Sequence, residues 1–381
     1  MKIGILTLPL YNNYGGLLQN FALQKVLVEL GYDVYTINIV GKIKRRPLLM
    51  IASIAKRYAM RLLGNNVAIR TSPTNKESRI IAYNTRQFVK KNIKTTSIIS
   101  QKVTQDLLEE YAFDAFIVGS DQVWRPRYSP QQSTYFLDFL EKNSSVKKIS
   151  YAASFGVDNW EFSDEQTKEF RRLLKQFNSV SVREDSAVSL CQKYFNVKPI
   201  HVLDPTLLLN KEVYIGLIDN NIEVDNDNPK HLFTYILDRD IDKNIIVERI
   251  SAKYELDVVS VMPKFLFKDP GKKDINDCIF PPVEDWLRGF INARFVVTDS
   301  FHGTVFAIIF NKPFITIANK DRGLTRFTSL LKMFQLEDRL IHSSEDFIPE
   351  NMKNIDWKRV NAVHIREQEK SLHFIKTHLC I

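Results

Sequence analysis

The chain has 381 residues, more than one ordinary hydrophobic core needs, so we expect two domains of moderate size. Hydrophobic residues make up 44% and charged residues 25% of the sequence, a balance that argues against a disordered or membrane-spanning protein. The net charge of +9 indicates an anionic partner, and the lack of a basic repeat with interleaved aromatic residues argues against nucleic acid.

The sequence offers no sign of an exported protein. Its three cysteines, Cys191, Cys278 and Cys380, are widely spaced, which argues against a disulfide framework and against a cysteine zinc site. The opening residues, MKIGILTLPLYNNYGG, lack a small-residue cleavage site, so we expect no signal peptide. Both features predict a cytoplasmic protein.

Strand-like and helical patterns alternate through the first half of the chain. Residues 2–8 predict a strand, 15–30 a helix that ends at Gly31, and 33–39 the next strand, which together make a βαβ unit. Further strands are predicted in FDAFIVGS, KKISYAAS, SVSVRE and IHVLDP. We therefore predict an N-terminal Rossmann-like domain over residues 1–205.

The same alternation starts again after Asp204 and Pro205. A polar stretch, LIDNNIEVDNDNPKH, predicts a loop, and four strands and four helices follow, in the order 232–238, 243–254, 256–262, 282–293, 294–299, 301–310, 313–318 and 324–334. We predict a second Rossmann-like domain over residues 206–350 and a C-terminal helix, within 351–381, that packs back on the first domain. The fold class is thus α/β, with two such domains facing a cleft.

A helical insertion at about 42–100 interrupts the first domain, and its first part, residues 42–64, is basic and amphipathic. Leu48, Ile51, Ile54, Tyr58 and Leu62 fall roughly along one helical stripe. One interpretation is a helix packed on the sheet with a solvated basic face. The other is a helix that lies on an anionic membrane surface.

Two strand ends of the first domain carry candidate binding residues, since ligands of open α/β sheets lie beyond the carboxyl ends of the strands. Gly15 and Gly16 open a helix, where unpaired N–H groups form either an anion site or a plain tight turn. A second set follows a buried strand and consists of Ser120, Asp121, Gln122 and Trp124. The polar side chains suit the hydroxyls of a sugar, and Trp124 offers a flat face on which the sugar can stack. The alternative there is an aspartate N-cap beside a core tryptophan.

Two strand ends of the second domain are cationic. Arg239, between Asp238 and Asp240, has the geometry to bind a carboxylate or phosphate, or to pair with a neighbouring aspartate. His302 stands at a strand-to-helix turn, either as a structural residue or as a proton donor facing the cleft, with Asp299 as the nearby acid. The basic loop one strand later contains Lys320, Arg322 and Arg326.

Several stretches between residues 12 and 327 resemble the polysaccharide pyruvyl transferase family in their order and spacing. They are NNYGGLLQNFALQKVLVELGYDV, FDAFIVGSDQVW, KKISYAASFG, SVSVREDSAVSLC, VLDPTLL, VVTDSFHGTVFAIIFNKPFI and RGLTRF. The resemblance implies two Rossmann-like domains in a GT-B-like arrangement. It also implies transfer of a pyruvyl group from phosphoenolpyruvate to two hydroxyls of one sugar in a surface-glycan precursor, with formation of a cyclic ketal.

The same resemblance suggests roles for the candidate residues. Characterised members have a functional Arg-Leu-His triplet at the matching turn, whereas this chain has Ser300, Phe301 and His302. We expect His302 as general acid and Asp121 as base. We expect the donor to bind Ser300, Arg239, Lys320 and Arg322, and the acceptor to bind Gly15, Gly16, Ser120, Gln122 and Trp124.

The expected partners are phosphoenolpyruvate and a glycan or lipid-linked sugar, with no metal, no cofactor and no nucleic acid. The segment 42–64 would allow peripheral contact with the inner membrane face. One alternative is a GT-B-type glycosyltransferase that uses a nucleotide sugar. The other is a glycan-binding scaffold without catalysis.

Overall fold

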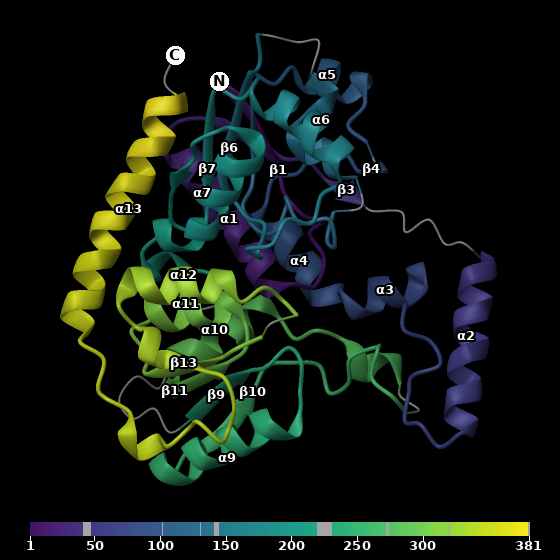
Figure 1. The fold of residues 1–381 in the computed structure, drawn as a ribbon, viewed down its shortest axis with the longest axis vertical. Helices are drawn as coiled ribbons and strands as arrows, with labels where there is room; N and C mark the ends of the chain where they lie inside the picture. The colour runs from purple at the N-terminus through teal and green to yellow at the C-terminus, as the bar shows by residue number, and fades with distance from the viewer. Residues whose placement is uncertain are drawn as a thin grey trace.

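The computed structural model describes residues 1–40, 47–100, 102–129, 131–140, 145–218, 231–271, 274–319 and 321–379. Within these ranges two α/β domains, each built on a parallel sheet, lie one above the other in Figure 1. The predicted loop at 217–231 lies almost entirely outside the described residues. The prediction of two parallel-sheet α/β domains is confirmed.

The first sheet has six parallel strands in the order β2-β1-β5-β6-β7-β8. Helices cover both faces, as the largely buried apolar strand residues require. The strands are β1 (Lys2–Leu6), β2 (Asp33–Thr36), β5 (Ala115–Val118), β6 (Lys147–Ala153), β7 (Ser179–Val182) and β8 (Ile200–His201). The main helices of this domain are α1 (Tyr14–Glu29), α6 (Asp164–Leu174) and α7 (Asp185–Leu190).

The second sheet has five parallel strands in the order β10-β9-β11-β12-β13. Its strands are β9 (His231–Tyr235), β10 (Asp257–Ser260), β11 (Ala293–Thr298), β12 (Phe314–Ile317) and β13 (Leu340–Ile341). Its helices are α9 (Ile241–Tyr254), α10 (Val283–Ile291), α11 (Phe301–Ile309) and α12 (Thr325–Phe334), and the short α8 (Lys211–Ile215) precedes the sheet. The two-residue strand β13 was not predicted, because it is too short to show alternation.

Helix α1 makes a buried contact with the second domain. Tyr14, in its first turn, stacks on Trp286 of α10 with ring centroids 5.6 Å apart. Its hydroxyl donates to the carbonyl of Pro281 at 2.8 Å. Both rings are fully buried, and one continuous hydrophobic core runs through both domains at this point. The N-terminus of α1 is therefore held firmly against the second domain.

The C-terminal helix α13 (Trp357–Leu379) runs along both domains and forms the left edge of the view in Figure 1. Ser371 on this helix accepts from the backbone N–H of Leu203 at 3.0 Å, and Phe374 packs against Tyr151. Both partners belong to the first domain. The helix thus returns from the second domain to the first.

The insertion between β2 and β5 holds four helices and a two-stranded sheet. They are α2 (Pro47–Leu62), α3 (Asn75–Ile81), α4 (Tyr83–Asn92) and α5 (Gln105–Tyr111), with β3 (Ile39–Val40) and β4 (Ile99–Ser100). Helix α4 packs on α1 through Phe88 and Phe21. Helix α2 stands apart at the right of Figure 1, and none of its described side chains, from Ile51 on, is buried. The interpretation of this segment as a helix packed on the sheet is therefore wrong.

Candidate functional site

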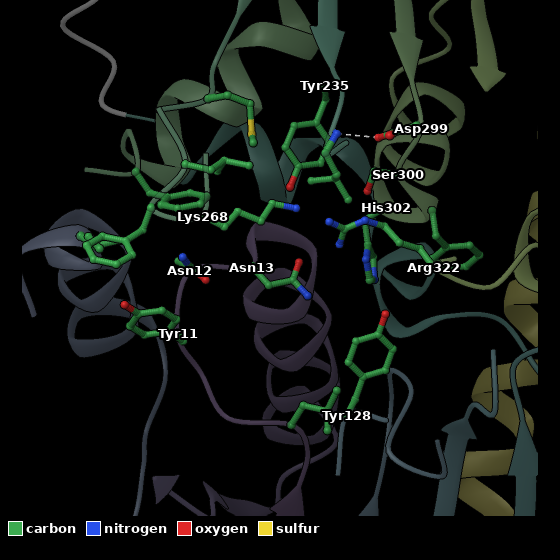
Figure 2. Close-up of a pocket in the computed structure, with 18 of the residues that line it drawn as sticks. Tyr11, Asn12, Asn13, Tyr128, Tyr235, Lys268, Asp299, Ser300, His302 and Arg322 are labelled. Atoms are coloured by element: carbon green, nitrogen blue, oxygen red, sulfur yellow. Dashed lines mark hydrogen bonds between the residues drawn. The ribbon is translucent and has the colours of Figure 1, made fainter. Parts of the chain in front are cut away.

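A pocket of about 390 Å³ lies between the two domains, at the carboxyl ends of β1, β5, β9 and β11. The first domain contributes Asn12, Asn13 and Tyr128, and the second contributes Tyr235, Lys268 and Arg322 (Figure 2). Parallel sheets bind ligands at this edge, and here two such edges face each other. The pocket is therefore the candidate site of the protein.

His302 lies in the wall of this pocket and is only 4% exposed. The turn that positions it is capped by Ser300, whose hydroxyl accepts from the N–H of Gly303 at 3.4 Å, as a helix N-cap does. A Cβ on Gly303 would lie 2.1 Å from the hydroxyl of Thr298, so glycine lets α11 start directly at the end of β11. The imidazole is thus fixed at the N-terminus of a buried helix.

The carboxylate next to His302 comes from the other domain. Asp204, just after β8, has its Oδ2 atom 3.5 Å from Nε2 of His302 and 2.7 Å from Nη1 of Arg183. It also accepts from the hydroxyls of Ser120, at 3.2 Å, and Thr206, at 2.7 Å. Burial raises the pKa of Asp204, but the nearby His302 and the charge and hydrogen bond of Arg183 outweigh it and hold that pKa well below its usual range.

Asp299, the acid expected beside His302, has a different role. Its carboxylate accepts from the backbone N–H of Leu237 at 2.6 Å, the bond drawn dashed in Figure 2, and pairs with Lys243 at 3.0 Å. Asn319 also donates to it at 3.2 Å. These contacts tie the end of β9 to the end of β11. Asp299 therefore shapes the rim of the pocket, while Asp204 provides the charge near the histidine.

Gly15 lies against the imidazole of His302. A Cβ built on Gly15 would come within 2.1 Å of Nδ1 and 2.2 Å of Cγ of that ring. The N-terminal turn of α1, which has no side-chain cap, therefore approaches His302 directly. Unpaired N–H groups at this turn favour an anion in the adjoining pocket.

We expect Gly15→Ala to displace the His302 ring and to reduce turnover by at least about tenfold, because small misplacements of reacting groups are costly. Gly16→Ala is the matched control. Its Cβ would meet only the flexible side chain of Asn13, at 3.0 Å. Steady-state kinetics of both variants, with circular dichroism to verify folding, would check this. Equal turnover in the two variants would contradict a functional contact between Gly15 and the histidine.

The pocket also contains a cation without an ion-pair partner among the described residues. Arg326 lines the pocket, is 6% exposed, and has no carboxylate within ion-pair distance among the described residues. Its Nη2 donates to the carbonyl of Arg322 at 2.5 Å, and its Nε has no hydrogen-bond partner. Burial, and then the charge of Arg183, lower the pKa of Arg326 to about 10. Such a guanidinium would gain from a bound anion.

The ring of Phe301 contacts both Arg183 and Arg326. The Cζ atom of Arg183 lies 4.5 Å from the ring centroid, and that of Arg326 lies 5.3 Å from it. The cation–π contacts hold both guanidinium groups beside the turn that carries His302. The two arginines nevertheless differ, since Arg183 is neutralised by Asp204 and Arg326 is not.

Arg322 also lines the pocket, but it forms an ion pair with Asp238. Its Nε and Nη2 donate to the two oxygens of Asp238, the second at 3.0 Å. Lys268 and Asn319 donate to the same carboxylate, each at 3.0 Å. Figure 2 shows the Lys268 ammonium group pointing toward the middle of the pocket. This cluster therefore places two cations at the rim, both paired with Asp238.

The candidates of the first domain divide between the pocket and the core. Asp121 and Gln122 line the pocket. Asp121 has a φ of +74°, an uncommon backbone conformation for a residue other than glycine, and its Oδ1 lies 3.5 Å from Nη2 of Arg183. Ser120 lies behind the pocket wall and donates to Asp204. The side chains after β5 thus either face the cavity or support the Asp204 network.

Trp124 does not face the pocket. Its indole is 0% exposed, stacks on Phe136 at 5.3 Å and donates to the carbonyl of Tyr135 at 3.0 Å. The prediction that it stacks on a sugar is wrong, because both ring faces are covered by the core. The alternative interpretation, a tryptophan in the core, agrees with the structure.

Two predicted cations are not placed in the pocket. Arg239 is exposed and is not among the residues that line the cavity. Lys320 lies outside the described residues. The residues that sequence reasoning missed are Arg183 and Asp204, and it named Arg326 without assigning it a role. The available signal was a charged residue near the end of each predicted strand, Arg183 in SVSVRE and Asp204 in IHVLDP.

Within the described residues, no group of three His, Cys, Asp or Glu side chains could hold a metal ion. Over the same part of the chain, no helix combines the length and the apolar character that crossing a membrane requires.

A sequence profile of polysaccharide pyruvyl transferases matches residues 13–321, most of the chain. The chain belongs to the polysaccharide pyruvyl transferase family. The match includes Asp121, Arg183, Asp204 and His302 and ends just before Arg322 and Arg326. Among curated proteins no significant sequence match is found.

Solved structures show the fold of this pyruvyl transferase family member. A protein of Listeria monocytogenes assigned as a UDP-N-acetylglucosamine 2-epimerase superposes with a TM-score of 0.56 at 11% identity, over 99% of this chain and 96% of its own. The S. aureus protein MnaA, solved with UDP, gives a TM-score of 0.53 at 14% identity, over 99% and 96%. At these identities the similarity concerns the fold alone, and the predicted GT-B-like arrangement is confirmed.

Proposed function

We propose that this protein transfers a pyruvyl group from phosphoenolpyruvate to two hydroxyls of one sugar in a surface-glycan precursor, forming a cyclic ketal. The observation that carries the proposal is the histidine at the pocket. His302 lies 3.5 Å from the buried carboxylate of Asp204, and Arg326, whose Nε has no hydrogen-bond partner, lines the same pocket. A proton donor and a cation for an anionic donor thus adjoin one cavity.

Phosphoenolpyruvate carries a phosphate and a carboxylate, and the pocket offers complementary charge for both. Arg326 provides a guanidinium with unused hydrogen-bonding capacity, and the N-terminal turn of α1 adds backbone N–H groups. Arg322 and Lys268 at the rim can exchange Asp238 for the ligand. Ser300, which replaces the arginine of the family pattern, caps α11 and lines the same pocket, so Arg326 would supply the missing cation.

The reaction starts with proton transfer from His302 to the methylene carbon of phosphoenolpyruvate, which leaves an oxocarbenium-like centre at the neighbouring carbon. One sugar hydroxyl attacks that centre, forming the first C–O bond and giving its proton to a base. The C–O bond to phosphate then breaks, the second hydroxyl closes the ketal, and its proton leaves with the phosphate. One hydroxyl proton thus replaces the one that His302 donated, so the protons balance.

Residues of the first domain that line the pocket suit the acceptor. Asp121 lines the pocket as an ionisable oxygen acceptor and is our candidate for the base. Gln122 lines the pocket beside it, and Figure 2 shows the hydroxyl of Tyr128 directed toward His302. Asp204 stabilises the site electrostatically, since its negative charge opposes the cost of burying a positive imidazolium.

Calorimetric titration with phosphoenolpyruvate tests the proposal through Arg326→Gln. We expect the dissociation constant to rise about 10- to 100-fold, because a hydrogen bond to a charged group contributes roughly 1.5–3 kcal/mol. Arg239→Gln is the matched control, since it removes the same charge from an exposed position outside the pocket. It should bind phosphoenolpyruvate as tightly as the unmodified protein. If both variants lost affinity equally, the binding would reflect net charge and not this pocket.

The second candidate function is a glycosyltransferase that uses a nucleotide sugar. It is favoured by one observation, that the structurally similar MnaA was solved with UDP. The same titration with UDP- and GDP-sugars separates the two functions. Saturable binding of a nucleotide sugar in place of phosphoenolpyruvate would replace our proposal with the glycosyltransferase.

A further inference from the structure

Helix α2 exposes an apolar stripe to solvent. Ile51, Tyr58 and Leu62 are 61%, 56% and 76% exposed, and with Ile54 they recur at helical spacing along one face. Leu63, directly after the helix, is exposed as well. In Figure 1 the helix lies beside the body of the protein and not on it. A run of exposed apolar side chains along one helix face indicates a surface that a binding partner covers.

The charge of α2 indicates what kind of partner covers its apolar stripe. Between residues 47 and 64 the basic side chains are Lys56, Arg57 and Arg61, and there is no aspartate or glutamate. Arg57 donates to the carbonyl of Ala68 at 3.3 Å, and Lys56 and Arg61 are exposed. A second copy of the helix would bring the same positive charge to the contact. A nucleic acid backbone would match the charge but leave the apolar stripe in water.

We propose that α2 binds the surface of an anionic lipid bilayer. The apolar stripe lies among the acyl chains near the headgroups, and the basic side chains contact anionic headgroups. The helix is too short and too charged to span the bilayer, so it lies parallel to the surface. The protein is then a peripheral membrane protein anchored through its insertion.

Membrane binding through α2 also indicates the class of acceptor, a point that rests on the proposed function. Thr71 and Pro73, which follow α2 in the chain, line the interdomain pocket, as do Leu266 and Phe267 of the second domain. The insertion that anchors the protein thus forms one wall of the site. A glycan on a lipid carrier would reach the pocket from this side.

Co-sedimentation with vesicles tests the inference without any substrate, so its outcome is independent of the proposed function. The vesicles contain phosphatidylcholine alone or equal parts of phosphatidylcholine and phosphatidylglycerol. We expect binding to the mixed vesicles only. Lys56→Gln/Arg61→Gln should weaken this binding roughly 25-fold, because each basic side chain near an anionic surface contributes about a factor of five.

The apolar stripe is tested by the triple variant Ile51→Ser/Tyr58→Ser/Leu62→Ser, which keeps the net charge and should lose at least about 100-fold in vesicle affinity. The matched control is Ile241→Ser/Val258→Ser/Ile365→Ser, which removes three exposed apolar side chains elsewhere and should bind as the unmodified protein does. Circular dichroism of each variant verifies folding.

Two results would overturn the inference. The first is a stripe variant that binds the mixed vesicles as well as the control variant does. The second is an unmodified protein that binds neither kind of vesicle but forms dimers in sedimentation velocity, while the stripe variant is monomeric. That result would show that the apolar stripe binds a second copy of the chain.

Discussion

His302→Asn is expected to lower the rate of pyruvyl transfer by about 10²- to 10⁴-fold, the usual contribution of a general acid. Asparagine keeps a polar side chain of similar length but cannot act as the acid that protonates the methylene carbon of phosphoenolpyruvate. The affinity for phosphoenolpyruvate should change by less than about threefold, because the proposed donor contacts come from other groups. Phosphate release from phosphoenolpyruvate in the presence of a glycan acceptor measures the rate, and calorimetry measures the binding.

His364→Asn provides the control for this experiment. His364 is a half-buried histidine of α13 that lies outside the pocket and contacts the carbonyl of Leu207 at 2.7 Å. Its replacement should leave turnover near that of the unmodified protein. A His302→Asn variant that folds, binds phosphoenolpyruvate and turns over at full rate would exclude His302 as the general acid.

Asp204→Asn is expected to lower the free energy of unfolding by about 3–5 kcal/mol at neutral pH. The change removes the carboxylate that neutralises Arg183, whose side chain is 1% exposed, and leaves that guanidinium buried with a longer ion pair to Asp121, at 3.5 Å, and with the charge of Glu184 nearby. Asp33→Asn is the control. It breaks an equally short ion pair with Lys94, at 2.7 Å, but both partners are about half exposed, so we expect less than about 1 kcal/mol. Urea unfolding of the three proteins gives the values.

The ion pair between Asp204 and Arg183 also predicts how the free energy of unfolding depends on pH. Since the pKa of Asp204 is lower in the folded protein than in the unfolded chain, its contribution to stability is complete above the unfolded value of about 3.9 and is lost as the pH falls below it. The stability difference between the unmodified protein and Asp204→Asn should therefore be constant from pH 7 to about pH 5 and shrink below about pH 4. A difference that grew on acidification would contradict a carboxylate with a lowered pKa.

The sequence alone determined the order of the main strands and helices and the family. Periodicity of apolar residues is a local property, so the βαβ unit of residues 2–39 and the helix that begins at Phe301 could be read directly. The change from a strand pattern to a helical pattern placed His302 at the strand-to-helix turn for the same reason. Asp121, Gln122 and Arg322 could be predicted at the edge of the sheets where the pocket lies, because each follows a parallel strand.

Only the tertiary structure decided which side chains meet. The nearest carboxylate to His302 in sequence is Asp299, but that group is used by Leu237 and Lys243, and Asp204 of the other domain lies beside the histidine instead. Trp124 is enclosed by the core. Arg326 is buried beside the pocket without an ion-pair partner among the described residues. The tertiary structure also decided that α2 stands free with its apolar stripe in solvent. Such pairings depend on how the two domains dock, and no local pattern of residues encodes that docking.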